Sequence, residues 1–369
     1  MKAKLILEDG TIFEGKSFGA AKSGAGEVVF VTGMVGYDLS LTDPSYAGQI
    51  LTFTYPLIGN WGVPPKDVWE SDKIQVAGLV ISDLTSVPSH WQSESSLDEW
   101  LKDEGIPGIY DIDTRRLTQK LREKGVMLGK IVVGDHDVKL YDPNLTNLVA
   151  EVSPKELKIH RPIVDGKLAK VHGLKIALLN CGAKKNILRN LLARGATVYE
   201  LPWDYDPFEN GFSIDGLVIS NGPGDPKMAN KSIAIIKIAL AKKIPTFGIC
   251  LGNQLLALAA GGNTYKLKFG HRAQNQPTIQ VEDPERSRRI GSKRCFITTQ
   301  NHGFAVDEKK MPHGFRRWFY NANDDTNEGI IHEKLPFFSV QFHPEASPGP
   351  KDAEFLFDYF LNEVKKRTV

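Results

Sequence analysis

The sequence predicts a two-domain protein: an N-terminal α+β domain with largely antiparallel strands, followed by an α/β domain with a mostly parallel sheet covered by helices. Three observations predict this fold class. A length of 369 residues suits two domains of about 100 to 200 residues each, and 41% hydrophobic residues can fill a core in both. The first half opens with a hairpin signal, and the second half alternates short apolar runs with helical runs.

The first half begins with antiparallel strands. Asp9 and Gly10 stand between alternating apolar residues, which predicts a β-hairpin. Leu117 and Leu121 are spaced as on one face of a helix that stops at Gly125. Further strands are predicted at residues 27–37 and 75–84, and helices at residues 96–105 and 113–125.

A connector separates the two halves. Residues 153–172 are polar, contain two prolines and lose clear periodicity, which is typical of a linker. We therefore expect the first domain to span residues 1–152 and the second to span residues 173–369, with the boundary near residue 170. Neither half contains an internal repeat.

The second half alternates strand and helix patterns. Strands are predicted at residues 174–180, 196–202, 215–220 and 245–249, and helices at residues 183–195, 232–243 and 251–262. This alternation predicts a parallel sheet covered on both faces, in which ligands bind at the carboxyl ends of the strands. Cys250 lies at one of those ends.

Charge and cysteine content exclude several classes of function. The chain has 46 Lys and Arg against 44 Asp and Glu, so no global field favours nucleic acid or an anionic membrane. The basic segment 285–294 is interpreted as a solvated hairpin flanking Gly291, because it has no interleaved aromatic residues to stack on bases. Three cysteines without C-x-x-C spacing predict neither disulfides nor a zinc or redox site. The apolar runs are too short for a signal peptide or a membrane span, so we expect a cytoplasmic protein.

Cys250 is the candidate nucleophile. A cysteine in a cytosolic chain is commonly a small buried hydrophobic residue. Here, however, Gly248 and Gly252 flank it in the G-x-nucleophile-x-G pattern, in which a sharp strand-to-helix turn exposes the central side chain. The helix N-terminus that follows stabilises a thiolate. The pattern therefore favours a reactive cysteine.

A thiolate also needs a base and a group that orients the base. His343 and Glu345 directly follow a strand-like run, and Pro344 and Pro348 fix the loop. Taken alone, "HPE" is a simple turn. Together with Cys250 in the same domain, it supplies the best candidate base and orienting carboxylate.

The loop 220–226, "SNGPGDP", follows a predicted strand and is rich in glycine. It lacks the G-x-x-x-x-G-K-[ST] pattern of nucleotide-binding loops. We expect the backbone N–H groups from Gly222 to Gly224, with that of Leu251, to bind an oxyanion formed when sulfur attacks a carbonyl.

Together these motifs resemble those of a known family. "GICLGNQ", "NGPGDP" and "FHPE" are similar to the class I glutamine amidotransferases, whose nucleophile, histidine and glutamate form a triad. In the first half, residues 41–63 and 108–125 resemble the N-terminal domain of carbamoyl phosphate synthetase small subunits, and "NCGAKKNILR" and "TTQNHGFAV" extend this resemblance over nearly the whole chain.

The resemblance implies a glutaminase that passes ammonia through a tunnel to a large synthetase subunit. That partner would use bicarbonate and ATP with Mg²⁺ to make carbamoyl phosphate for arginine and pyrimidine synthesis, whereas this chain would hold no cofactor and no metal. Cys250 would be the nucleophile, His343 the base and acid, and Glu345 its orienting partner. The resemblance implies these residues for binding glutamine: Ser45, Gly222, Gly224, Leu251, Gln254, Asn301, Gly303 and Phe304.

Ser45 belongs to the first domain, so the resemblance places the site where the domains meet. Asn253 stands where many relatives have histidine, and we expect activity to survive this difference because the position varies among class I amidotransferases.

Two alternatives remain at this stage. A free-standing cysteine hydrolase of γ-glutamyl amides would share the nucleophile turn but would leave residues 1 to 150 without a use. A regulatory subunit with a vestigial triad is disfavoured because Cys250, His343 and Glu345 are all present. Amidotransferases that make anthranilate or guanylate lack this N-terminal domain.

Overall fold

The computed structural model describes residues 1–164, 167–168, 173–209, 211–281 and 294–368. The chain divides into two compact units, Met1–Leu148 and Val149–Val369. This division lies upstream of the predicted boundary near residue 170. Part of the predicted connector, Lys158–His160, forms strand β10 and pairs with β14 (Thr197–Pro202) in the second unit. Polar and apolar residues alternate only weakly along this edge strand because it is largely exposed, and its sequence therefore resembles that of a linker.

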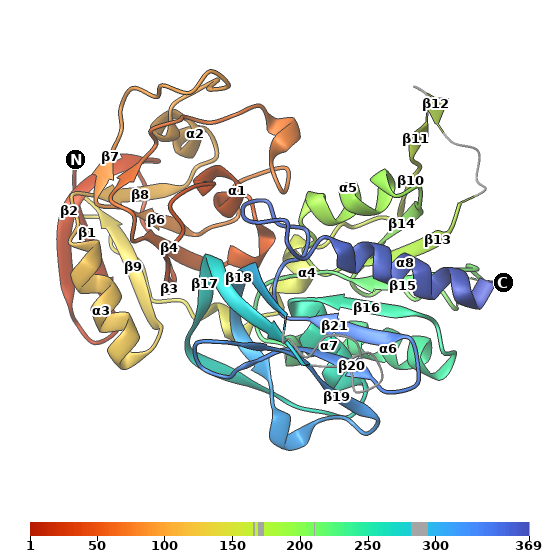
Figure 1. Ribbon diagram of the computed structural model, residues 1–369. Helices are drawn as coiled ribbons and strands as arrows, with labels where there is room; N and C mark the ends of the chain where they lie inside the picture. Colours follow the sequence, from red (N-terminus) through yellow and green to blue (C-terminus); the bar gives the residue numbers. More distant parts are fainter. Residues whose placement is uncertain (165–166, 169–172, 210, 282–293, 369) are drawn as a thin grey trace. The chain divides into compact units, whose positions relative to one another are not determined.

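The first unit is built around a closed barrel (Figure 1). The barrel order is β1 (Lys2–Leu7), β2 (Ile12–Gly19), β8 (Pro107–Tyr110), β6 (Gly78–Val80), β4 (Gln49–Phe53), β3 (Gly24–Val31) and β9 (Met127–Val133). Strands β1 and β2 form the predicted hairpin, with Ile6 opposite Ile12 and Gly10 at a φ of 83° in the turn. In the run β3, β9, β1, β2 and β8, each strand pairs with the next in antiparallel orientation. In the run β3, β4, β6 and β8, each strand pairs with the next in parallel.

Both predicted helices of the first unit are confirmed. Helix α2 (Leu97–Asp103) begins at a capping box of Ser96 and Glu99, and α3 (Thr114–Lys124) begins at Asp113 and stops at Gly125. The predicted strands are shorter than expected. Gly36 adopts a φ of 69° and is followed by helix α1 (Tyr37–Leu41), so the strand predicted at residues 27–37 ends early. A small sheet pairs β5 (Leu57–Ile58) with β7 (Asp83–Leu84).

The second unit contains one ten-stranded sheet. Besides β10 and β14, its strands are β13 (Lys175–Asn180), β15 (Gly216–Ile219), β16 (Thr246–Ile249), β17 (Thr264–Gln280), β18 (Cys295–Val306), β19 (Phe315–Asn321), β20 (Asn327–His332) and β21 (Phe337–Val340). The predicted parallel part is confirmed for β14, β13, β15, β16 and β21. An antiparallel ribbon of β20, β19, β17 and β18, which we did not assign from the sequence, extends the sheet beyond β21.

Helices cover both faces of the parallel strands, as predicted (Figure 1). On one face, α5 (Lys185–Ala193) and α8 (Phe355–Thr368) pack over a core that includes Phe247 and Phe360. On the other face, α6 (Asn230–Ala241) and α7 (Leu251–Ala259) pack over a core that includes Leu217 and Leu255. The chain also contains helix α4 (Leu148–Val152) and the paired strands β11 (Ile163–Val164) and β12 (Lys167–Leu168).

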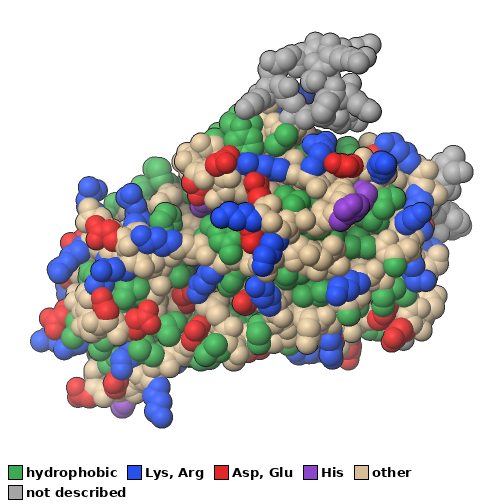
Figure 2. Space-filling model, turned by 90° about the horizontal axis from the view of Figure 1, so that it is seen from below, with side chains coloured by type: hydrophobic (Ala, Val, Ile, Leu, Met, Phe, Trp, Pro, Cys, Tyr) green, Lys and Arg blue, Asp and Glu red, His purple; other side chains and the backbone are tan. Residues whose placement is uncertain are grey.

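The surface agrees with the balanced composition. On the face drawn in Figure 2, acidic and basic side chains are interspersed among apolar ones. Most of the basic segment 285–294, which we interpreted as a hairpin, lies outside the described residues, although β17 and β18 on either side of it pair antiparallel. Among the described residues, every helix is too short or too polar to cross a bilayer.

Candidate active site

Cys250 sits in a sharp turn between β16 and α7. It is one of the non-glycine residues with positive φ, at 54°, with a ψ of −104°. Glycines on both sides make the turn sterically allowed: a Cβ on Gly252 would lie 2.2 Å from the carbonyl oxygen of Ile219, and a Cβ on Gly248 would lie 2.4 Å from the carbonyl oxygen of Gly252. The turn is therefore the nucleophile turn that the G-x-Cys-x-G pattern predicts.

Replacing Gly252 with alanine tests this close packing. Helix propensity alone would favour alanine by about 1 kcal/mol. Because the added methyl group would collide with the backbone oxygen of Ile219, we expect a net loss of about 1–3 kcal/mol in the free energy of unfolding. Urea denaturation of both chains measures the difference. A stabilised variant would show that the turn relaxes without cost.

Cys250 is only 2% exposed, so the prediction that the turn exposes this side chain is wrong, because Asn301 and Gln341 lie against the sulfur. Its backbone N–H donates to the carbonyl oxygen of Val340 at 2.8 Å, which ties the turn to the end of β21. The sulfur lies 3.7 Å from the carbonyl oxygen of Asn301 and 3.7 Å from Nε2 of Gln341. Residues from β18 and from the segment after β21 therefore surround the thiol.

His343 is fixed from both sides. Its backbone N–H donates to the carbonyl oxygen of Thr299 at 2.8 Å, and its Nδ1 lies 2.6 Å from Oε1 of Glu345. Nε2 is buried without a hydrogen-bond partner among the described residues. Burial disfavours the imidazolium, but the charges of Glu345 and of the Cys250 sulfur overcome it and raise the pKa of His343 to about 10. Glu345 therefore orients the imidazole and favours its protonated form.

A buried lysine completes the array, and we did not single it out from the sequence. Lys184 is 1% exposed, and its Nζ lies 3.2 Å from Oε1 of Glu345 and donates to the carbonyl oxygen of Ala346. Asn186 donates to the backbone carbonyl of Glu345. Burial raises the pKa of the Glu345 carboxyl, but the charges of Lys184 and His343 outweigh burial and lower it to about 2. Lys184 therefore helps to keep Glu345 ionised.

The depressed pKa of Glu345 predicts a pH dependence of stability. A carboxyl whose pKa is lower in the folded state contributes stability above its unfolded value of 4.5, and this contribution is lost as pH falls toward 2. As the pH is lowered from 5 to 2, we expect the free energy of unfolding to decrease less in Glu345→Gln than in the parent chain. Denaturant titrations across that window measure both slopes. Equal slopes would show that this carboxyl does not couple folding to protons.

Asn253 contributes to the surroundings of the thiol. Its side chain is fully buried, accepts a hydrogen bond from the Ser339 hydroxyl at 2.7 Å and donates to Oε1 of Gln341 at 3.0 Å. Gln341 in turn directs its Nε2 toward the sulfur. Asn253 thus orients an amide donor that faces Cys250. No sequence motif that we used pointed to Gln341.

The structure gathers most of the predicted glutamine-binding residues beside Cys250. Gln254 on α7 donates to the carbonyl oxygen of Phe304 at 3.0 Å, and Asn301, Gly303 and Phe304 follow one another along β18. Gly222 approaches Leu251 so closely that a Cβ would lie 2.8 Å from the leucine side chain.

Other predicted residues are placed less directly. Gly224 has a φ of 81° in the loop that follows β15. Ser45 belongs to the first unit, where it is buried in a 3-10 helix, Pro44–Tyr46. Leu251 is the first residue of α7, so its N–H has no partner within the helix. The oxyanion role of these N–H groups and the glutamine contact of Ser45 stay predictions.

Comparisons with known proteins agree with the two units. Residues 5–131 match the family described as carbamoyl-phosphate synthase small chain, CPSase domain. Residues 177–363 match the family described as glutamine amidotransferase class-I.

Curated relatives fall into two size classes. The chain is 44% identical to the carbamoyl phosphate synthase arginine-specific small chain of Neosartorya fischeri, over 99% of this chain and 80% of that protein. It is 49% identical to multifunctional protein pyr1-3 of Dictyostelium discoideum and 50% identical to multifunctional protein CAD of Squalus acanthias. These two alignments cover 98% and 97% of this chain but only 17% and 16% of the relatives.

Proposed function

Because the chain belongs to the family of carbamoyl-phosphate synthase small chains, with a class I glutamine amidotransferase domain, we propose that it is the glutaminase subunit of a carbamoyl phosphate synthase. It would hydrolyse L-glutamine to glutamate and ammonia. This proposal rests above all on three buried side chains, those of Cys250, His343 and Glu345, which follow the carboxyl ends of β16 and β21. The hydrolysis itself needs no cofactor in this chain.

The geometry supports a two-stage reaction. The Cys250 thiolate attacks the side-chain amide carbon of glutamine and forms a C–S bond, and the carbonyl oxygen becomes an oxyanion. His343 then gives its proton to the departing nitrogen, the C–N bond breaks, and ammonia leaves behind a thioester. A water molecule, deprotonated by His343, attacks the thioester and releases glutamate and the thiolate. Glu345, held by Lys184, keeps the imidazole oriented in both stages.

Backbone donors would stabilise the oxyanion. Leu251 is the first residue of α7, where its N–H has no partner within the helix and the helix dipole favours negative charge. Gly222 lies against the Leu251 side chain, which supports a shared role of the two N–H groups. Loss of one such donor costs about 10²- to 10³-fold in rate in related chemistry. We propose that Gln254, Asn301, Gly303 and Phe304 bind glutamine from α7 and β18, that Gly224 contributes from the glycine-rich loop, and that Ser45 contributes from the first unit.

The partner would be a large synthetase subunit. Ammonia is a nucleophile only while it is unprotonated, so a tunnel into the partner would protect it from water. There, bicarbonate and ATP with Mg²⁺ would complete carbamoyl phosphate for arginine and pyrimidine synthesis. The matched small-chain domain at residues 5–131 supports an assembly role, because a free-standing γ-glutamyl hydrolase gives that domain no task. All three cysteines are free, which suits the cytoplasmic location that we propose.

One experiment tests this function. Glutamate release by the purified chain is measured alone and with a large synthetase subunit, bicarbonate and ATP, while size-exclusion chromatography follows co-elution. We expect hydrolysis, co-elution and glutamine-dependent carbamoyl phosphate synthesis. Hydrolysis without any co-elution would support the free-standing hydrolase instead. Co-elution without hydrolysis would overturn the glutaminase assignment.

A further inference from the structure

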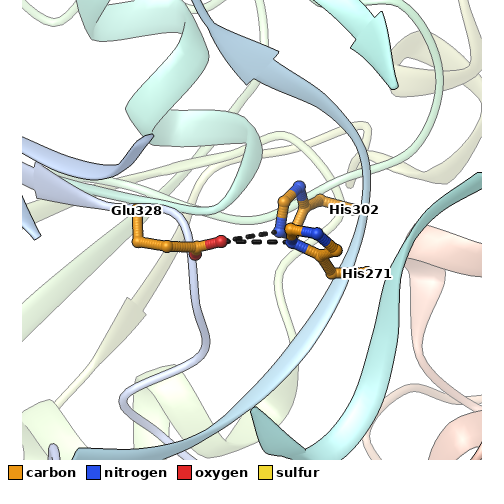
Figure 3. A group of neighbouring side chains, drawn as sticks. All are labelled: His271, His302 and Glu328. Atoms are coloured by element: carbon orange, nitrogen blue, oxygen red, sulfur yellow. Dashed lines mark hydrogen bonds and ion pairs between the residues drawn. The ribbon is translucent and has the colours of Figure 1, made fainter. Parts of the chain in front are cut away.

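Three potential metal ligands meet within the antiparallel ribbon of the second unit. His271 lies on β17, His302 on β18 and Glu328 on β20, and they are 9%, 4% and 0% exposed. Figure 3 shows one carboxylate oxygen of Glu328 directed at both imidazole rings. That oxygen, Oε1, is 3.2 Å from Nδ1 of His271 and 3.6 Å from Nε2 of His302.

The outer nitrogens of both histidines have the partners that metal-bound histidines have. Nε2 of His271 lies 2.9 Å from Oδ2 of Asp324, and Nδ1 of His302 lies 2.9 Å from the carbonyl oxygen of Phe304. A carbonyl accepts only, so Nδ1 of His302 carries a proton. In the neutral ring, Nε2 then carries a lone pair, and it faces Oε1 of Glu328 at 3.6 Å and Oε1 of Gln300 at 3.4 Å. A histidine that donates one N–H to a carboxylate or carbonyl and turns its other nitrogen inward is the usual arrangement around a metal.

Two of the three spacings between the inward-facing atoms fit a tetrahedral ion. Ligands bound at about 2.0–2.2 Å from a tetrahedral zinc ion lie about 3.3–3.6 Å apart. The two distances from Glu328 Oε1, 3.2 and 3.6 Å, lie close to the ends of this range, and all three ligand atoms lie within 4.8 Å of one another. The imidazole planes meet at 87°, so their lone pairs converge from different directions.

Glu328 supplies an independent observation. Its second carboxylate oxygen, Oε2, is buried without a hydrogen-bond partner among the described residues. Removing a carboxylate from water is costly unless a positive charge compensates it. A divalent cation beside both imidazoles would supply that charge and would accept either oxygen as a ligand.

We propose that His271, His302 and Glu328 form a binding site for a divalent transition metal ion, with zinc as the best match. Two imidazoles and one carboxylate are ligands that zinc accepts, and a water molecule can complete the coordination. The ion would join β17, β18 and β20, and His302 stands between Asn301 and Gly303. Its role is therefore structural: it fixes the segment of β18 beside the thiol and does not touch the reacting atoms.

The sequence offered no signal for this site. The three ligands are far apart along the chain and form none of the short His and Cys spacings that mark zinc motifs, so we had expected no metal. The pairing of β17 with β18 and β19, and of β19 with β20, brings them together.

Metal titration of the full chain tests the proposal. The chain is stripped with a chelator and titrated with Zn²⁺ against a competing indicator, and with Co²⁺ followed by visible absorption. We expect one tight equivalent and a tetrahedral Co²⁺ spectrum without thiolate charge-transfer bands. Glu328→Gln and His302→Gln should weaken binding at least 10-fold. Asp324→Asn replaces the carboxylate that faces Nε2 of His271 with a neutral amide and should weaken binding about 10- to 100-fold.

Two controls separate this site from other ligands. Cys250→Ser, combined with Cys295→Ser, removes a buried and an exposed thiol, and this variant should still bind one equivalent of Zn²⁺. His313→Gln changes an exposed histidine outside the cluster and should also still bind one equivalent of Zn²⁺. The proposal would be overturned if the parent chain did not bind Zn²⁺, or if Glu328→Gln and Asp324→Asn bound it with unchanged affinity. It would also be overturned if Zn²⁺ binding were lost when the two thiols are removed. Circular dichroism of every variant verifies folding.

Discussion

Replacing Cys250 with serine will lower the rate of glutamine hydrolysis by at least about 10³-fold, because a hydroxyl at this position has neither the acidity nor the nucleophilicity of a thiol. The charge of the Cys250 sulfur is one of the causes that raise the pKa of His343 to about 10. A serine hydroxyl would not provide that charge near neutral pH. Release of glutamate by the purified variant, in the presence of the large subunit, measures the loss.

The fold is expected to survive this change. Serine replaces sulfur with oxygen and leaves the backbone turn and both flanking glycines in place. Carbamoyl phosphate synthesis from added ammonia should therefore persist in the complex, since that step belongs to the proposed partner. Cys295→Ser, which changes an exposed thiol, is the matched control and should hydrolyse glutamine normally. Full glutaminase activity in Cys250→Ser would exclude Cys250 as the nucleophile.

Replacing His343 with asparagine should reduce kcat for glutamine hydrolysis by roughly 10³- to 10⁴-fold, since members of a catalytic triad act as a unit. The variant loses the proton donor for the departing ammonia. Glu345→Gln keeps the imidazole but replaces the 2.6 Å contact between Nδ1 and the carboxylate by a neutral one. It should be no more damaging than His343→Asn. Steady-state kinetics of both variants decide this order.

The variants His343→Asn and Glu345→Gln also distinguish a catalytic role of His343 from a purely structural one. If His343 only packs in a turn, both variants should hydrolyse glutamine at near-normal rates, and the interpretation of "HPE" as a simple turn would be restored. If Glu345 acts through His343, the double variant should be about as slow as His343→Asn alone, because non-additivity marks residues that work together.

Local pattern predicted much of the second unit. The parallel strands and helices between residues 174 and 262 follow from short apolar runs alternating with helical periodicity, and the turn at Cys250 follows from two glycines. These features depend on residues that are close in sequence. His343 and Glu345 were found through their position after a strand, without knowledge of what they contact.

Features that depend on distant pairings were not predictable. Closure of the barrel requires β9 to pair with both β1 and β3, and nothing local in its sequence specifies two partners. Lys184 looks like any solvated lysine until Glu345 is placed beside it. Gln341 acquires its direction from Asn253, some 90 residues earlier, through a hydrogen bond that only the folded sheet creates.

The nucleophile turn has a consequence for how this site can change during evolution. Cys250 packs into the core beneath α5 and α8, whereas the next residue, Leu251, packs into the core beneath α6 and α7. The positions of these two adjacent residues therefore depend on the helices on opposite faces of the sheet. A substitution that shifts either layer moves the sulfur relative to the donor that follows it, so drift on one side of the sheet requires compensating substitutions on the other. Lineages that keep the reaction must therefore diversify both layers together, or confine their changes to surfaces away from this turn.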